Sequence, residues 1–202
     1  MKSISHLFRR PKNQNFVTIV SGLPRSGTSM MMKVLEAGGL PVLTDNIRSA
    51  DDDNPKGYYE YERVKKMPEG DIAWLADARG KVVKVISALL EYLPQEYSYR
   101  VIFMRRNIQE ILASQRQMLV RSGKPTDKVS DEKLAKMYQK HLAKVESWLA
   151  AQPNVTVLFI NYNAILQDPQ PYLREVNKFL GNTLSDDKMA SMIDPALYRQ
   201  KA

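Results

Sequence analysis

Four short apolar runs alternate along the chain with longer segments of helical periodicity. The runs are rich in β-branched residues, as buried strands are, and they cover residues 16–21, 81–87, 99–104 and 155–160. Hydrophobic positions three and four apart predict helices over residues 26–37, 107–119, 130–149 and 170–180. This alternation predicts a three-layer α/β domain, with a parallel sheet of about four to five strands and helices on both faces.

Individual side chains and connecting segments refine these predictions. We expect the helix over 130–149 to bury a stripe that includes Met137, Leu142, Val145 and Trp148. Residues 41–58 read as irregular, with short helices expected over 60–67 and 71–77. In open parallel sheets, ligands bind beyond the carboxyl ends of the strands.

The length of 202 residues suits one domain, which we place at residues 16–202 behind a basic, flexible arm at residues 1–15. The arm holds four of the 30 basic residues and no acid, so about half of the net charge of +8 lies there. We expect the arm to be solvated, with peripheral contact to an anionic membrane as the alternative, and we expect no nucleic-acid partner. No apolar run reaches the roughly 18 residues of a membrane span, and no secretory signal is recognisable, so a cytoplasmic protein is expected.

The chain has no cysteine and two histidines, His6 and His141. This composition excludes disulfides and thiol catalysis, and a structural zinc site is not expected. The acidic run at residues 51–53 is interpreted as a solvated loop rather than a metal site. We expect His141, on a helix beside Leu142, to have a structural role.

The most informative segment is residues 16–29, where an apolar run opens into Gly22-Leu23-Pro24-Arg25-Ser26-Gly27-Thr28-Ser29. A nucleotide-binding P-loop has the same G-x4-G frame followed by Lys and then Ser or Thr. Here Thr28 takes the lysine position and the cation lies inside the loop as Arg25. Such a loop can hold an anion at a helix N-terminus but lacks the lysine that serves ATP–Mg²⁺ or GTP–Mg²⁺. A different phosphate-bearing donor is therefore expected.

A second anion-binding pattern follows the third apolar run, which ends in Arg105-Arg106 before a helix begins at Asn107. Ser114 lies two helical turns on, back on the face of the helix start. An arginine at the strand end and a hydroxyl on that face can grip one phosphate together, and the spacing to Ser114 favours Arg106 over Arg105. A nucleotide with groups at both its 5′ and 3′ positions would fill the two pockets.

These motifs resemble the sulfotransferase family, whose donor is 3′-phosphoadenosine 5′-phosphosulfate. The family's 5′-phosphosulfate loop resembles residues 24–29, and its 3′-phosphate motif, an Arg with a Ser eight residues later, matches Arg106 and Ser114. The family also has a helix that ends in a Trp-Leu pair, then a strand, then the pattern Tyr-x-x-x-Leu. These features match Trp148-Leu149, residues 155–160 and residues 162–166, respectively. The resemblance implies a P-loop fold of the sulfotransferase type and places Tyr162 near the adenine.

The chain departs from the cytosolic branch of that family and is nearer the branch with an Arg-Ser-Gly-Thr loop. The branch's Lys-Thr-His run corresponds to Lys84-Val85-Ile86, so the lysine is kept and the histidine base is absent. The branch's downstream Arg-Lys-Gly loop is absent too.

The resemblance implies sulfuryl transfer to a hydroxyl or amine, with no metal required. The donor-binding residues would be Arg25, Ser26, Gly27, Thr28, Ser29, Arg106, Ser114 and Tyr162. Arg25 and Lys84 would stabilise the leaving oxygen. A carboxylate would be the base, either Asp45, by resemblance to protein-tyrosine sulfotransferases together with Arg48, or Glu60, after an aromatic loop; Glu36 is a weaker candidate.

Two other functions are kept open: a small-molecule or nucleotide kinase on the same fold, and a non-catalytic module that binds 3′-phosphoadenosine nucleotides. The missing P-loop lysine speaks against the kinase. The acceptor, whether a small molecule, lipid or glycan, and the oligomeric state cannot be read from these residues.

Overall fold

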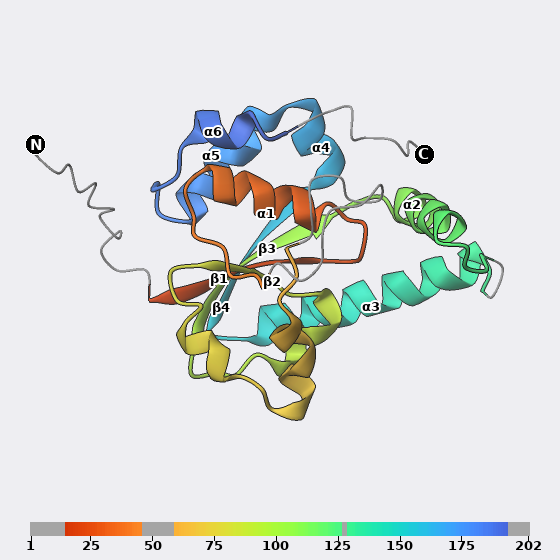
Figure 1. Cartoon of the computed structure of the whole chain (residues 1–202), viewed down its shortest axis with the longest axis horizontal. Coiled ribbons are helices and arrows are strands. Elements are labelled where there is room, and N and C mark those ends of the chain that lie inside the picture. Colours follow the sequence, from red (N-terminus) through yellow and green to blue (C-terminus); the bar gives the residue numbers. More distant parts are fainter. Residues whose placement is uncertain (1–14, 46–58, 127–128, 194–202) are drawn as a thin grey trace, which may run out of the picture.

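A computed structural model of the protein describes residues 15–45, 59–126 and 129–193. In chain order its elements are β1 (Phe16–Gly22), α1 (Thr28–Ala37), η1 (Glu62–Glu69), η2 (Ala73–Ala76), β2 (Val82–Lys84), η3 (Ser87–Tyr92), β3 (Ser98–Arg105), α2 (Ile108–Arg121), α3 (Asp131–Ala151), β4 (Val155–Asn161), α4 (Tyr162–Gln167), α5 (Pro169–Phe179) and α6 (Asp186–Ala190). Figure 1 shows their arrangement.

The described strands form one parallel sheet in the order β2-β1-β3-β4. Strands β1 and β3 are neighbours and pair over the whole of β1, from Phe16 opposite Ser98 to Gly22 opposite Met104. Their carboxyl ends therefore lie side by side at one edge of the sheet. The segments that follow them, including Arg25 and Arg106, begin at that same edge, as the sequence predicts.

Helices cover both faces of the sheet, which confirms the three-layer α/β prediction. Helices α1, α4, α5 and α6 lie on one face, and α3 lies on the other with the 3₁₀ segments (Figure 1). Side chains alternate along β1 in the same sense, because Val20 packs on the α1 side while Val17 and Ile19 pack on the α3 side. Two apolar cores result, one on each face.

Two of the predicted strands differ from expectation. β2 ends at Lys84, where residues 81–87 were expected to form a single strand, and Ser87 already begins η3. β4 has the expected position but is only half-buried, since it pairs with β3 alone, and Phe159 is 38% exposed. An edge strand buries less of its surface than a central one of the same composition.

The helix predictions are largely confirmed, with three corrections. Met137, expected in the buried stripe of α3, is 55% exposed. The short helices expected over 60–67 and 71–77 are the 3₁₀ segments η1 and η2, and Pro68 lies inside η1. Helices α4 and α6 were not predicted. None of the helices within the described ranges is long and apolar enough to cross a membrane.

Several residues named from the sequence lie outside the described residues: His6 and the rest of residues 1–14, Arg48, residues 51–53 and Tyr58.

Candidate functional site

The loop between β1 and α1 depends on close approach of its backbone to neighbouring groups. A Cβ on Gly22 would lie 2.5 Å from Ser26 Oγ and 2.6 Å from the backbone oxygen of Met104. Any side chain at Gly22 would thus push the loop away from β3. Glycine here keeps the loop against the carboxyl end of the neighbouring strand.

Two further residues of the loop have positive φ angles, Arg25 at 67° and Gly27 at 98°. The left-handed conformation is unusual for arginine and costs about 1–2 kcal/mol, so the surrounding structure must stabilise it. A Cβ on Gly27 would lie 2.3 Å from Cδ2 of Tyr162. The loop is therefore clamped between the end of β3 and the start of α4.

The loop opens into the N-terminus of α1, with Gly27 as the N-cap residue. Gly27 provides no side-chain cap, and the first turn has no acidic residue. The N–H groups of a first turn have no partner inside their own helix, and the helix dipole favours an anion beside them. The hydroxyl of Ser26 is buried and has no hydrogen-bond partner among the described residues. Both features suit a phosphate group.

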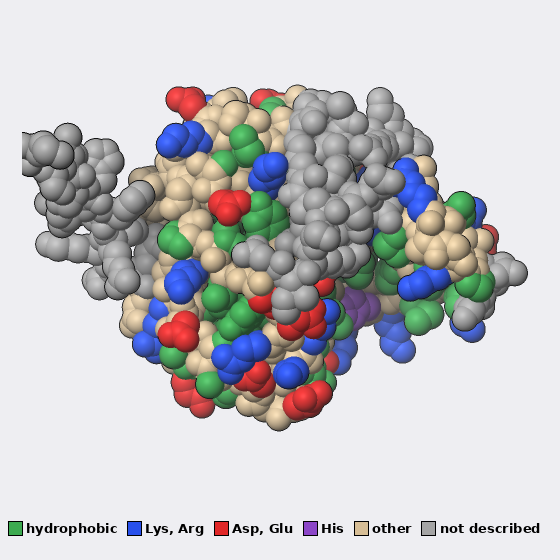
Figure 2. All heavy atoms as spheres, viewed as in Figure 1, with side chains coloured by type: hydrophobic (Ala, Val, Ile, Leu, Met, Phe, Trp, Pro, Cys, Tyr) green, Lys and Arg blue, Asp and Glu red, His purple; other side chains and the backbone are tan. Residues whose placement is uncertain are grey.

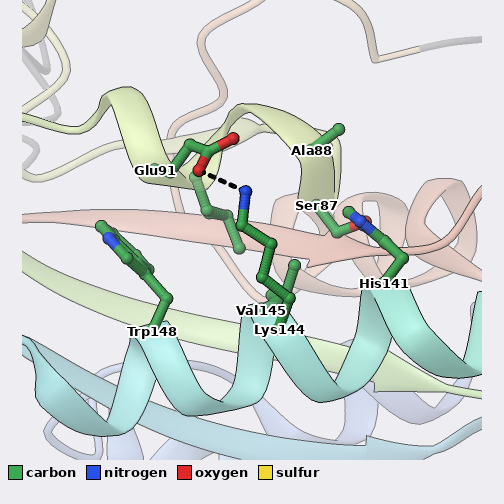
Figure 3. Close-up of a pocket in the computed structure, with 8 residues that line it drawn as sticks. Ser87, Ala88, Glu91, His141, Lys144, Val145 and Trp148 are labelled. Atoms are coloured by element: carbon green, nitrogen blue, oxygen red, sulfur yellow. Dashed lines mark hydrogen bonds and ion pairs between the residues drawn. The ribbon is translucent and has the colours of Figure 1, made fainter.

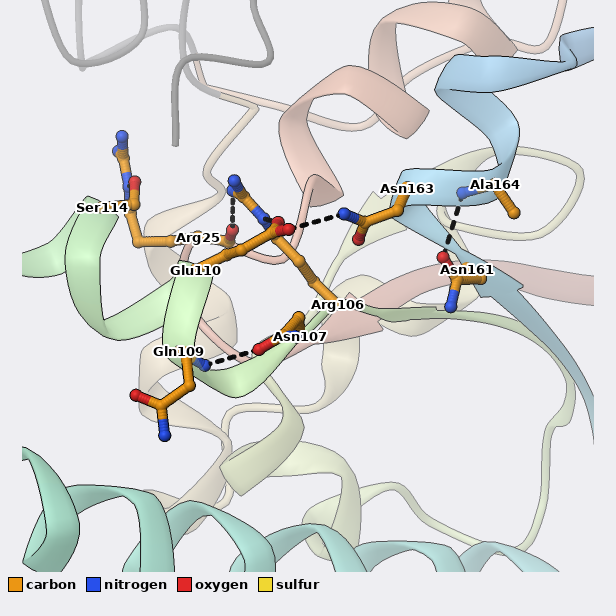
Figure 4. A network of polar contacts seen from close by, with 9 residues as sticks. All are labelled: Arg25, Arg106, Asn107, Gln109, Glu110, Ser114, Asn161, Asn163 and Ala164. Carbon is orange, nitrogen blue, oxygen red and sulfur yellow. Dashed lines mark hydrogen bonds and ion pairs between the residues drawn. The ribbon is translucent and has the colours of Figure 1, made fainter. Parts of the chain in front are cut away.

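Arg106 lies beside this loop, buried and held on several sides (Figure 4). Its Nε donates to Glu110 Oε2 at 2.8 Å, and its Nη1 donates to the backbone oxygen of Arg25 at 3.0 Å. Its guanidinium carbon lies 4.5 Å from the centre of the Tyr162 ring. The arginine predicted for the second pocket thus directly contacts the loop of the first.

Glu110 completes this cluster and was not singled out from the sequence as a site residue. It is 4% exposed, and its second oxygen accepts a 2.7 Å hydrogen bond from Asn163 Nδ2. The spacing of four residues from Arg106 on a helix start is the signal that could have found the pair. Asn163 follows Tyr162 in α4, so this contact ties α2 to α4.

Tyr162 is buried, and this burial raises the pKa of its phenol, with the charge of Arg106 opposing the rise. The phenol therefore stays neutral at physiological pH. Its ring contacts both the loop, at Gly27, and the guanidinium of Arg106. Tyr162 joins the two predicted pockets as a wall shared by both.

Ser114 lies where the sequence places it, on the face of α2 that turns toward the loop, and there it contacts Arg25. Arg25 Nε donates to Ser114 Oγ at 2.9 Å. The side chain of the first pocket and the hydroxyl predicted for the second pocket are therefore in direct contact. This hydrogen bond therefore joins residues predicted for the two anion pockets.

The neighbouring Arg105 differs from Arg106 in exposure. Its Nη2 lies 2.8 Å from Glu146 Oε1, with both side chains more than one third exposed, and its guanidinium stacks on Phe159. Both arginines therefore pair with an acid, since Arg106 pairs with Glu110.

Lys84 lies at the carboxyl end of β2 and reaches across to the first helix. Its Nζ is 3.4 Å from Ser29 Oγ. Because β2 is the neighbour of β1 on the side away from β3, Lys84 flanks the loop opposite Arg106. Lys84 thus approaches the N-terminus of α1 from β2, while Arg25 lies in the loop that leads into that helix.

The candidate carboxylates lie near the end of β2 but have structural contacts. A bridge between Val42 and Val82 brings residues 41–45 alongside β2. Asp45 Oδ2 accepts from the backbone N–H of Glu62 at 2.6 Å, and the Glu60 carboxylate lies 3.7 Å from Lys65 Nζ.

Glu36, the weaker candidate, accepts a 2.6 Å hydrogen bond from the hydroxyl of Tyr59. This contact and burial together raise the pKa of Tyr59. Tyr61 packs edge-on against the buried ring of Trp74, so Tyr61 has a contact in the core.

A family model described as "Sulfotransferase domain" matches residues 17–200 of the chain. The protein belongs to the sulfotransferase family. The match spans nearly the whole chain, including the loop after β1, the arginine pair after β3 and α4. This sulfotransferase is therefore an enzyme that transfers sulfuryl groups, as the resemblance of its motifs implies.

Solved structures with the same fold are also sulfotransferases, at low sequence identity. Sulfotransferase STF1 from Mycobacterium tuberculosis H37Rv is 17% identical with a TM-score of 0.58, and the alignment covers 89% of this chain and 71% of that one. The sulfotransferase domain from the curacin biosynthetic pathway is 14% identical with a TM-score of 0.52, covering 89% and 78%.

Retinol dehydratase, solved in complex with androsterone and the inactive cofactor PAP, is 16% identical with a TM-score of 0.51, covering 90% and 64%. These likenesses confirm the fold of the sulfotransferase described here. No curated protein sequence matches the chain.

Proposed function

We propose that this sulfotransferase takes its sulfuryl group from 3′-phosphoadenosine 5′-phosphosulfate and transfers it to the hydroxyl or amine of an acceptor. One observation carries the proposal: the loop after β1 and the arginine after β3 are in direct contact. Arg106 donates to the backbone of Arg25, and Arg25 donates to Ser114. A single nucleotide with a group at each of two positions matches two adjoining anion pockets.

The residues of the first pocket fit a 5′-phosphosulfate. The uncapped N-terminus of α1 offers backbone N–H groups, and the buried hydroxyl of Ser26 has no protein partner among the described residues. Glycine at position 27 lets this backbone approach the Tyr162 ring closely. Thr28 and Ser29 add hydroxyl groups on the first turn of the same helix.

The residues of the second pocket fit a 3′-phosphate and an adenine. An arginine has five N–H donors, so Arg106 can serve Glu110 and a bound phosphate oxygen together. The ring of Tyr162 is a flat apolar surface beside that guanidinium. Ser114 supplies a hydroxyl two turns into α2.

The cations of the site support the chemistry of the transfer. Sulfuryl transfer resembles phosphoryl transfer, in which negative charge gathers on the leaving oxygen. Arg25 and Lys84 both lie at the N-terminus of α1, so both can stabilise charge that develops there. Neither role depends on a metal.

Calorimetric titration of the wild-type protein tests the proposal directly. The protein should bind 3′-phosphoadenosine 5′-phosphate more tightly than ATP–Mg²⁺ because Thr28 replaces the P-loop lysine. Mass spectrometry should then detect sulfated acceptor when donor is supplied with a panel of hydroxyl and amine compounds. Tighter binding of ATP–Mg²⁺ would favour the kinase, and tight nucleotide binding with no turnover would favour the binding module.

A further inference from the structure

Four side-chain contacts connect the elements at the carboxyl edge of the sheet in a ring. Lys84 at the end of β2 reaches Ser29 of α1, and Arg25 of the loop reaches Ser114 of α2. The ring continues into α3, because Tyr138 donates to Gln115 Oε1 of α2 at 2.6 Å.

The ring closes at Ser87, only three residues after Lys84. Ser87 Oγ lies 2.8 Å from His141 Nε2 of α3. The contact of Ser87 with His141 therefore joins α3 to the segment that leaves β2 just after Lys84. Figure 2 shows a hollow between the body of the molecule and the part formed by α2 and α3, with a histidine side chain (purple) on its wall.

Ser87 and His141 also line a cavity of about 100 Å³ between η3 and α3 (Figure 3). Its other walls are partly apolar, with Leu90, Val145 and Trp148 among the lining residues. Ser87 is 3% exposed, so its hydroxyl fixes the imidazole from a rigid position. A mixed apolar and polar cavity of this kind suits the hydroxyl-bearing end of a small organic acceptor.

The charged groups around His141 favour its neutral form. Burial lowers the pKa of the imidazole below its ordinary value of 6.5, and the ammonium of Lys144 on the same helix lowers it further. Glu91 of η3 acts in the opposite direction but is paired with Lys144 at 2.8 Å. His141 is therefore unprotonated at neutral pH, as a general base must be.

We propose that His141, positioned by Ser87, is the general base that takes the proton of the acceptor hydroxyl. The sequence favours a structural role for His141 because nothing in it places α3 beside η3. This inference rests on the proposed function and deepens it, because it assigns the acceptor side of the same site. It stands against Asp45 and Glu60, whose carboxylates contact Glu62 N–H and Lys65.

The step balances as follows. The acceptor oxygen forms a bond to sulfur while the bond between sulfur and the bridging oxygen of the donor breaks. The electron pair of that bond stays on the 5′-phosphate, which leaves as 3′-phosphoadenosine 5′-phosphate. In the tautomer in which Nε2–H donates to Ser87 Oγ, Nδ1 carries the lone pair, so Nδ1 receives the acceptor proton and later releases it to water.

The decisive test compares His141→Gln with the wild-type protein, using as acceptor either 4-nitrobenzyl alcohol, whose hydroxyl does not ionise over the pH range of the assay, or water alone. We expect the variant to bind 3′-phosphoadenosine 5′-phosphate as the wild type does, and to lose about 10²-fold or more in turnover. In the pH–rate profile, the wild-type rate should fall on acidification through a pKa below 6.5. This acidic limb of the profile should be missing in the variant. A carboxylate base would ordinarily place such a limb near pH 4.

Three further variants sharpen the result. Lys140→Gln, on the exposed surface of the same helix, should leave both rate and pH profile unchanged. Ser87→Ala should lower the rate and shift the limb, and Ser87→Thr should restore much of both. Asp45→Asn and Glu60→Gln should keep the limb.

Each remaining outcome separates this inference from the proposed function. If His141→Gln turns over as fast as the wild type, or if Asp45→Asn or Glu60→Gln removes the limb, the assignment of the base is wrong while the donor site stands. A wild-type protein that binds the product nucleotide but turns over with neither acceptor also overturns it. A wild-type protein that fails to bind the nucleotide overturns the proposed function instead.

Discussion

Gly27 is the residue at which the anion-binding loop meets α4. Its φ angle of 98° favours glycine, and its Cβ position is occupied by the Tyr162 ring. Gly39 has a similar φ angle of 104° but nothing within 4 Å of its Cβ position. Substitution of Gly39 therefore tests the backbone strain alone, and substitution of Gly27 tests the same strain together with the steric contact with Tyr162.

Gly27→Ala should destabilise the fold more than Gly39→Ala and should abolish binding of 3′-phosphoadenosine 5′-phosphate. Both changes incur the left-handed penalty of about 1–2 kcal/mol, and Gly27→Ala adds an overpacking cost of about 1–3 kcal/mol. Urea denaturation and calorimetry measure the two effects. Equal destabilisation by the two changes, with binding retained, would show that the Tyr162 contact is unimportant.

Lys84 gives a second prediction at the residue scale. Lys84→Met should lower the rate of sulfuryl transfer by about 10²–10³-fold, because a cation is lost near the leaving oxygen. The affinity for 3′-phosphoadenosine 5′-phosphate should change little if the lysine acts in the transition state. Steady-state rates with either acceptor, set beside calorimetric affinities, distinguish the two effects. A variant that loses affinity and keeps its maximal rate would assign Lys84 to ground-state binding.

At the scale of elements, the junction between β3 and α2 presents two arginine–carboxylate pairs with different surroundings. Arg106 and Glu110 are 7% and 4% exposed, whereas Arg105 and Glu146 are 45% and 36% exposed. Removing one partner of a buried pair leaves an uncompensated charge, and an exposed pair contributes little. The exposed pair of Arg105 and Glu146 is therefore a matched control for the buried pair of Arg106 and Glu110.

Glu110→Ala should destabilise the protein by about 3–5 kcal/mol, because Arg106 stays buried without its carboxylate. Glu146→Ala should cost no more than about 1 kcal/mol. Chemical denaturation of the two variants gives the comparison. Similar losses in both would mean that the Arg106 charge finds another partner when Glu110 is removed.

The sequence predicts the elements of this site better than their partners. The loop at residues 22–29 is readable because its motif is contiguous. The pair of Arg106 and Ser114 is readable because it spans only a strand end and the helix that follows. The contact of Ser114 with Arg25 depends on how α2 packs on the loop, and the proximity of Ser87 to His141 depends on α3 lying beside η3. Local sequence patterns do not predict how α2 packs on the loop or how α3 packs beside η3.

The hydrophobic pattern of the sequence also did not predict how deeply some apolar side chains are buried. β4 is as apolar as β3, but its place at the end of the strand order leaves Phe159 partly exposed. Met137 falls in the apolar stripe of α3 and yet is exposed, because the stripe does not pack along its whole length. Strand order and helix extent are properties of the assembled layers.

At the scale of the whole molecule, the strand order places the two arginine-bearing segments next to each other. β1 and β3 are central neighbours, β2 flanks them with Lys84, and α1, which follows β1, and α3, which comes after β3, cover opposite faces (Figure 1). The topology therefore gathers the loop, Arg106 and Lys84 at one edge. This arrangement is the basis of the proposal that one doubly substituted nucleotide occupies both pockets.

The most direct measurement of that claim is the affinity of the protein for 3′-phosphoadenosine 5′-phosphate relative to adenosine 5′-phosphate. The double variant Arg106→Leu with Glu110→Leu removes the arginine without leaving a buried carboxylate unpaired. The matched double variant Arg105→Leu with Glu146→Leu removes the exposed pair one residue earlier.

In calorimetry, the wild type and the Arg105 double variant should both prefer the 3′-phosphorylated nucleotide. The Arg106 double variant should lose that preference by about ten- to a hundredfold, the value of one charge-assisted hydrogen bond, while its affinity for adenosine 5′-phosphate stays the same. A preference that survives in the Arg106 double variant, or an equal loss of affinity for both nucleotides, would contradict the account.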